Sequence, residues 1–366
     1  MGTLPQYFVD PNSGSDSTGD GLSDSSAWAS LQHALDTITP AARGDQINLK
    51  AGTANVLTGN LNFSTYNPQI RRKLIVRGYT TSPNDGGIGT IDGDSSYQIG
   101  VLNTSALIDL EIRNLTSAAD GISMVANYSQ LINCYIHTVN RDAIGIVQGR
   151  SQIIDCRFEN ISRSACRAFA GLARNCYFAN GADYSFTNAL NLAAQGHLLN
   201  CFFVLSGSSN GVDCTNQGHA TINCTFFGGG SSGSGYINES SDGRGSTFAE
   251  NIVAGFSGTG GKGCNNLSDW GLMFRNNSFH DNETNIVDPS QGEEAYGEKF
   301  NNESLSSSPF ALSGANNFAN RLAYFEPKDV GNVLSGDFPR GAVSSVSGGA
   351  AVHPLSASNS HPLDAG

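Results

Sequence analysis

Two carboxylates and two guanidinium groups stand at related positions in this chain. Asp120 and Asp142 each come directly before a short apolar segment, "GISMV" and "AIGIV", and Arg141 and Arg163 lie near them. If the segments are equivalent repeats, these side chains gather on one face, where carboxylates could transfer protons. Carboxylates just before a strand also cap turns. Turn capping is the interpretation that we prefer for these four catalytic candidates.

An acidic loop near the N-terminus could hold a metal ion. The segment "DPNSGSDSTGDG" offers Asp10, Asn12, Asp16 and Asp20, whose oxygen atoms are of the kind that Ca²⁺ binds. The loop lacks the residue order and the final Glu of an EF-hand. We therefore prefer a turn that its own Asp and Asn side chains stabilise, keep a structural Ca²⁺ as the alternative, and predict no other cofactor.

Two Gly-His pairs could also contribute to chemistry. They occur at Gly196-His197 and Gly218-His219, at similar places in consecutive repeats. A histidine can polarise a substrate, but a turn copied between repeats is more simply structural.

The composition limits the classes of partner. Charged residues make up only 14% of the chain, and the net charge of −12 leaves no basic stripe that could neutralise phosphates, so we expect no nucleic-acid partner. No apolar run reaches the length of a membrane-spanning helix, so we expect no membrane partner. With 44 Gly residues and abundant Ser, Thr and Asn, the chain favours many strands joined by tight turns.

A short unit repeats through the middle of the chain. "NCYI", "DCRF", "NCYF", "NCFF" and "NCTF" recur, and their cysteines are separated by 22, 20, 25 and 23 residues. A second short element lies about a dozen residues before each. Units of this length without a helix cannot bury their own apolar face, but stacked units form a continuous core.

The repeat predicts an all-β, right-handed parallel β-helix of about eight to ten rungs. Rungs stack at about 4.8 Å, so equivalent side chains form ladders along the axis. Residues two apart in a strand share a face, which predicts two inward ladders. The thiol ladder comprises Cys134, Cys156, Cys176, Cys201 and Cys224, and the mainly aromatic ladder comprises Ile136, Phe158, Phe178, Phe203 and Phe226. The Asn or Asp before each Cys should point outward or sit at a strand edge. We expect reduced, buried cysteines.

The N-terminal end of the solenoid needs a cover. Residues 26–38 place Trp28, Leu31, Leu35 and Ile38 at helical spacing, with Asp24, Ser25 or Ser26 available as N-cap. We expect residues 1–44 to form a strand, a loop and this capping helix. The β-helix should cover residues 45–288, followed by a closing segment at 289–343 and an extended polar tail at 344–366.

The entry segment resembles that of a known group. "YFVDPNSGSDSTGDGLSDSSAWASLQHALDTI", "RGDQINLKAGT" and "KLIVRGYTTSPNDGGIGTIDGD" look like the start of right-handed parallel β-helix proteins of the pectin-lyase-like superfamily. That resemblance implies the scaffold, and it is shared by polysaccharide lyases, bacterial surface proteins and phage virion proteins. The Asn-Thr-Asp, Asp-Asp, Gly-His-Gly and Arg-Ile-Lys motifs of polygalacturonase-like enzymes are absent from the sequence.

Three functions fit this scaffold. The first residues show no signal-peptide pattern and few charged groups converge, so our main prediction is a non-enzymatic bacteriophage virion component, either a capsid decoration protein or a tail spike. It would assemble in the host cytoplasm as a homotrimer with other virion proteins and possess, at most, glycan-binding activity. The alternatives are an extracellular polysaccharide lyase or glycoside hydrolase, and a bacterial surface adhesin.

Overall fold

The computed structural model describes most of the chain up to residue 304. Described are residues 4–304 apart from 40–43, 64–72, 102–104, 116–119, 125–127, 148–149, 180–187, 193–195, 215–218, 240–245, 268–271, 276, 288–298 and 301–302. The predicted tail at 344–366 and nearly all of the closing segment at 289–343 lie outside these residues.

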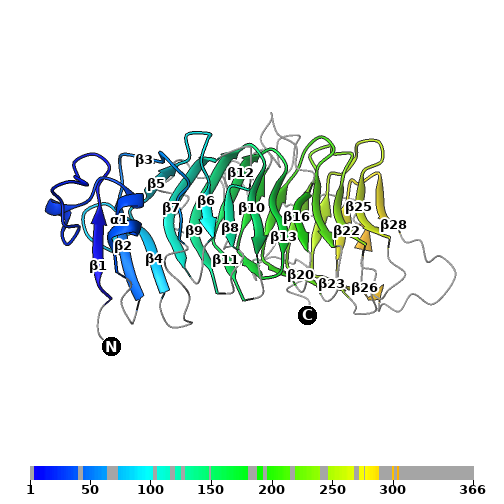
Figure 1. Ribbon diagram of the computed structural model, residues 1–366. Helices are drawn as coiled ribbons and strands as arrows, with labels where there is room; N and C mark the ends of the chain where they lie inside the picture. Colours follow the sequence, from blue (N-terminus) through cyan, green and yellow to red (C-terminus); the bar gives the residue numbers. More distant parts are fainter. Residues whose placement is uncertain are drawn as a thin grey trace, which may run out of the picture.

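The described residues form a parallel β-helix, in which successive coils stack along one axis (Figure 1). A 21-stranded sheet folds into two limbs, and β7 (Ala106–Leu115) and β9 (Gln130–Val139) run through both. A nine-stranded sheet supplies the remaining side of each coil. All strand pairings among the described residues are parallel, as stacked coils require. The predicted all-β parallel β-helix is confirmed.

The strands fall into three stacks. The first limb contains β1 (Gln6–Val9), β2 (Gly44–Lys50), β4 (Lys73–Tyr79), β11 (Gln152–Ile154), β14 (Leu172–Arg174), β17 (His197–Leu199), β20 (Ala220–Ile222), β23 (Ser246–Ala249), β26 (Leu272–Arg275) and β29 (Lys299–Phe300). The second limb contains β3 (Asn55–Val56), β5 (Gly89–Asp92), β12 (Arg157–Ile161), β15 (Tyr177–Ala179), β18 (Phe202–Val204), β21 (Thr225–Phe227), β24 (Ile252–Ala254), β27 (Ser278–His280) and β30 (Glu303–Ser304). The nine-stranded sheet contains β6 (Ile99–Val101), β8 (Ile122–Met124), β10 (Asp142–Val147), β13 (Ser164–Phe169), β16 (Asn188–Leu192), β19 (Asn210–Cys214), β22 (Ser234–Asn238), β25 (Lys262–Asn266) and β28 (Thr284–Val287).

The corner between the two limbs explains the residue that precedes each repeated cysteine. At this corner Asn133, Asp155, Asn175, Asn200 and Asn223 have φ between 52° and 56°, in the left-handed region that Asn and Asp tolerate best. Their side chains also bond along the axis. The Asn175 amide donates to Asp155 at 2.9 Å, and the Asn200 amide donates to Asn175 at 3.3 Å. The sequence predicted that these side chains point outward or sit at a strand edge, and the structure adds a sharp bend in the backbone.

Both predicted interior ladders are confirmed. The five thiols are at most 2% exposed, and their Sγ atoms contact backbone carbonyl oxygens. Two residues further on, neighbouring strands pair Ile136 with Phe158, Phe158 with Phe178, and Phe203 with Phe226. The Phe203 and Phe226 rings stack with centroids 4.6 Å apart. All eight cysteines are free and buried.

The N-terminal helix is shorter than predicted. α1 covers Leu31–Thr37, and its N-cap is Ser30, whose hydroxyl accepts from the His33 backbone N–H. The predicted caps at residues 24–26 form instead a separate 3-10 turn, η1 (Asp24–Ser26). The helix starts later because Trp28 forms a β-bridge with Val9 while its ring is buried. Leu31 and Leu35 cover the end of the core as expected.

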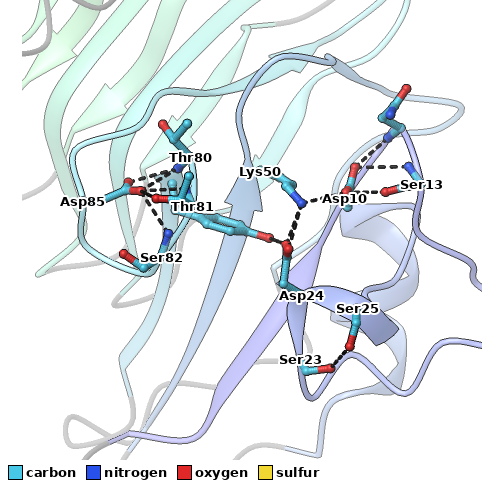
Figure 2. Close-up of polar contacts among 12 residues, drawn as sticks. Asp10, Ser13, Ser23, Asp24, Ser25, Lys50, Thr80, Thr81, Ser82 and Asp85 are labelled. Carbon is cyan, nitrogen blue, oxygen red and sulfur yellow. Dashed lines mark hydrogen bonds and ion pairs between the residues drawn. The ribbon is translucent and has the colours of Figure 1, made fainter.

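A salt bridge network joins this N-terminal segment to the first coils (Figure 2). Lys50 Nζ lies 2.8 Å from Asp24 and 3.2 Å from Asp10, and the Tyr79 hydroxyl donates to Asp24. Nearby, Asp85 accepts backbone N–H bonds from Thr80 and its two successors. These contacts hold the turn after β4 and attach the cap to the solenoid.

No helix in the described part of the chain has the length and hydropathy needed to cross a membrane.

Candidate active site

Two columns of side chains point outward from the second limb around β9. Ile136 and Phe158 point into the core, so the residues next to them in β9 and β12 point to the outer face of the sheet. One outer column comprises Thr90, Glu111, Tyr135, Arg157 and Tyr177, and the other comprises Asp92, Arg113, His137 and Glu159. We call these nine residues the β9 face. It concentrates acid–base, cationic and aromatic groups on adjacent coils.

A histidine and a glutamate form the centre of the β9 face. His137 Nε2 lies 2.9 Å from Glu111 Oε1, and His137 Nδ1 lies 2.9 Å from the Thr138 hydroxyl. An ionised Glu111 can only accept, so Nε2 carries the proton and the Thr138 hydroxyl donates to Nδ1 when His137 is neutral. This is the arrangement of a hydroxyl, a base and a carboxylate that orients the base. The His137 side chain remains 16% exposed.

The surroundings keep Glu111 ionised. Burial opposes ionisation, but hydrogen bonds from His137 and Thr90 and the charge of Arg113 outweigh it and lower the pKa of Glu111. Thr90 Oγ1 donates at 2.9 Å and Arg113 Nη1 at 3.2 Å. Arg113 Nε also donates to Asp92 at 2.8 Å, so this guanidinium bridges two carboxylates.

Aromatic rings order the next part of the β9 face. The Tyr135 ring stacks on His137 with centroids 4.3 Å apart, and its hydroxyl donates to Glu159 at 2.8 Å. The Arg157 guanidinium lies between the Tyr135 and Tyr177 rings, 5.4 and 5.0 Å from their centroids, and Nη2 bonds Glu159. Burial, reinforced by Glu159, raises the pKa of Tyr135. Tyr135 is therefore a protonated donor at neutral pH.

Three of the four predicted catalytic candidates meet on the nine-stranded sheet. Arg163 binds Asp142 through Nε at 2.8 Å and also through Nη2. Arg167, which the sequence did not single out, links Asp120 at 2.8 Å to Asp142 at 3.5 Å. The fourth candidate, Arg141, lies in the turn before β10, where its carbonyl accepts from the Arg163 backbone N–H.

This cluster suits structure or binding better than proton transfer. The Asp142 side chain is fully buried against two guanidinium groups, whereas Arg163 and Arg167 are 38% and 45% exposed. The hydrogen bond with Asp142 raises the pKa of Arg163, so this guanidinium is a poor base. The catalytic role considered for the four residues remains untested.

The acidic N-terminal loop uses its carboxylates locally. Asp10 accepts from the backbone of Asn12 and Ser13 and contacts Lys50, while Asp16 accepts from Ala29 and Ser30 ahead of α1. Asp20 accepts from the Leu22 backbone and the Ser26 hydroxyl. Among the described residues, no three His, Cys, Asp or Glu side chains gather in a way that could hold a metal ion. The calcium site stays a prediction.

The two Gly-His pairs are out of register by one residue between neighbouring coils. His197 pairs with Ala220, and His219 Nδ1 instead accepts from the Gly196 backbone N–H at 3.1 Å. His219 is buried, so its contact is structural. His197 is exposed on the first limb.

The sequence analysis missed the β9 face because its outward residues change in type from one repeat to the next, whereas the inward cysteines recur. The available signal was the outward position between each repeated cysteine and aromatic residue. Aligning the repeats on their cysteines places Tyr135, Arg157 and Tyr177 in one column and His137 beside Glu159 in the next.

Solved structures with this fold include polysaccharide lyases. Pectate lyase Pel9A superposes with a TM-score of 0.59 at 16% identity, covering 91% of this chain and 88% of the lyase. A rhamnogalacturonan lyase gives 0.53 at 12% identity, covering 92% and 96%. No protein-family model and no curated protein matches the chain. These likenesses show the fold, a parallel β-helix that this chain shares with both lyases.

Proposed function

We propose that this protein is a carbohydrate-active enzyme that cleaves a polysaccharide at the β9 face. The observation that carries the proposal is the Thr138–His137–Glu111 hydrogen-bond chain on an outer β-helix surface. Support from the fold comes from the two solved structures named as a pectate lyase and a rhamnogalacturonan lyase.

The chemistry assigned to this chain is proton transfer. Neutral His137 takes up a proton at Nδ1, through the Thr138 hydroxyl, while Glu111 stabilises the imidazolium that forms. In elimination that proton leaves a sugar carbon, the glycosidic C–O bond breaks, and the leaving sugar oxygen takes a proton back from the imidazolium, directly or through solvent. In hydrolysis the proton leaves the attacking water, the glycosidic C–O bond breaks, and the imidazolium returns the proton to the leaving sugar oxygen in the same way. Proton transfer from a positioned side chain typically contributes about 10²- to 10⁴-fold in rate.

The solenoid suits a long substrate. Equivalent positions repeat along the axis at about 4.8 Å, so a chain of sugars lying across β5, β7, β9 and β12 meets a new pair of outward side chains on each coil. The β9 face supplies donors, acceptors and rings in that direction.

Incubation of the protein with neutral and acidic polysaccharides tests the proposal. New reducing ends without ultraviolet-absorbing products indicate hydrolysis, and unsaturated ends indicate elimination. Failure to cleave any member of a broad panel would count against an enzyme. The virion role, the homotrimer and the virion location predicted from the sequence gain no support from the structure or the comparisons, and they remain untested.

A further inference from the structure

Arg157 has hydrogen-bonding capacity that the described part of the chain does not use. The residue is 5% exposed and Nη2 bonds Glu159. Its Nε and Nη1 atoms are buried, and among the described residues neither has a hydrogen-bond partner. A buried donor without an acceptor costs about 1–3 kcal/mol, so two such donors on one guanidinium are unusual in a residue that serves only stability.

The geometry holds this guanidinium ready for a ligand. Tyr135 and Tyr177 lie against it, 5.4 and 5.0 Å from Cζ to the ring centroids, and fix its plane. Glu159, held in turn by the Tyr135 hydroxyl at 2.8 Å, fixes its rotation. Because the rings occupy the flanks of the guanidinium, only its edges are left for acceptors, and a ligand reaches the buried Nε and Nη1 atoms by displacing the atoms that cover them. This is preorganisation of a donor pair.

Charge identifies the class of acceptor. Glu159 already balances Arg157, and Arg113 is shared between Asp92 and Glu111. Apart from His137, the β9 face therefore carries three negative and two positive groups, in a chain of net charge −12. A polyanion finds no excess of positive charge there. Hydroxyl and ring oxygens of a neutral sugar accept hydrogen bonds without adding charge.

We propose that Arg157 is a sugar-binding residue that donates from Nε and Nη1 to oxygens of a neutral glycan. This inference rests on the proposed function and names its substrate class. Glu159 pairs in register with His137, so the glycan unit at Arg157 lies one coil from the proton-transfer group. The side chains of His137 and Glu159 are 16% and 14% exposed, so solvent reaches both of them. A neutral sugar has no carboxylate to acidify a C–H bond, so its cleavage proceeds by hydrolysis.

Titration calorimetry of the whole protein tests the inference without requiring turnover. The probes are cellohexaose, xylohexaose and mannohexaose, with hexagalacturonate as the acidic counterpart. We expect at least one neutral hexaose to bind more tightly than hexagalacturonate. Loss of two hydrogen bonds in Arg157→Met should weaken that binding by about tenfold or more. The exposed arginine on β14 gives a matched control, Arg174→Gln, which should bind as the wild type does.

A second variant guards against misfolding. Arg157→Met with Glu159→Gln removes both partners of the ion pair and leaves no unpaired buried charge. Wild-type affinity in this folded double variant, tighter binding of hexagalacturonate, or absence of binding by all three neutral hexaoses would overturn the inference. Cleavage of a polysaccharide that does not depend on Arg157 would overturn it while leaving the proposed function intact. Arg157-dependent binding of a neutral hexaose without cleavage of any polysaccharide would support the inference and count against the proposed function.

Discussion

The Thr138 hydroxyl lies 2.9 Å from Nδ1 of His137, on a backbone with φ of 54°. A β-branched residue rarely adopts this left-handed conformation. The equivalent positions on the adjacent coils are Asn114 and Asn160, which adopt it with φ of 52° and 50°. Backbone strain at this one coil accompanies the contact with the proposed proton-transfer group.

Replacing the threonine should separate stability from activity. We expect Thr138→Asn to stabilise the fold by about 1 kcal/mol, because Asn tolerates the left-handed region, and to slow polysaccharide cleavage. Urea unfolding and initial rates measure the two effects. The reciprocal Asn160→Thr should destabilise the fold by a similar amount. Equal stability of wild type and Thr138→Asn would show that the backbone there is unstrained.

Glu111 should make stability depend on pH. Its pKa is lower in the folded protein, so its contribution is complete above the unfolded value of about 4.3 and disappears as the pH falls through the folded value. We expect Glu111→Gln to cost about 2 kcal/mol at pH 7 and much less in acid. Asp92, whose pKa is also lowered, is present in both proteins, so it enters the difference only through the Arg113 that it shares with Glu111. Urea unfolding of both proteins at a series of pH values measures the difference in their free energies of unfolding. A difference that does not change with pH would contradict a lowered pKa for Glu111.

Much of the fold could be predicted from the sequence, because its causes are local and repeated. The interval between Cys134 and Cys156 fixes one coil, and strand alternation then places Ile136 over Phe158. The length of α1 could not be predicted, since Trp28 joins a β-bridge that depends on a contact with Val9. The β9 face depends on register between coils, which puts His137 beside residues more than twenty positions away, and no single repeat contains that information.

Asp142 should be a structural residue. The buried carboxylate holds Arg163 and Arg167, so Asp142→Asn leaves two guanidinium groups with weaker partners. Because both arginines are more than a third exposed, solvent limits the expected loss to about 1–2 kcal/mol. The cleavage rate of the folded protein should stay close to that of the wild type. A loss of rate without a loss of stability would instead restore the catalytic role considered from the sequence.

The thiol ladder should be unreactive in the native protein. Burial raises the pKa of Cys156, Cys176 and Cys201, and all eight cysteines are free and buried. Labelling by iodoacetamide should be slower than in urea by on the order of a hundredfold, because the thiolate forms only on opening. Mass spectrometry counts the labelled sites. Rapid native labelling of the five repeated cysteines would contradict an interior ladder.

The most direct test of the account compares two histidines in the same outer column. His137 lies within the β9 face, and His280 lies on β27, further along the same limb. On a polysaccharide that the wild type cleaves, His137→Gln should lower the initial rate by about a hundredfold or more, with unchanged thermal unfolding, and His280→Gln should leave the rate unchanged. Cleavage at the wild-type rate by His137→Gln would contradict the proposed proton transfer.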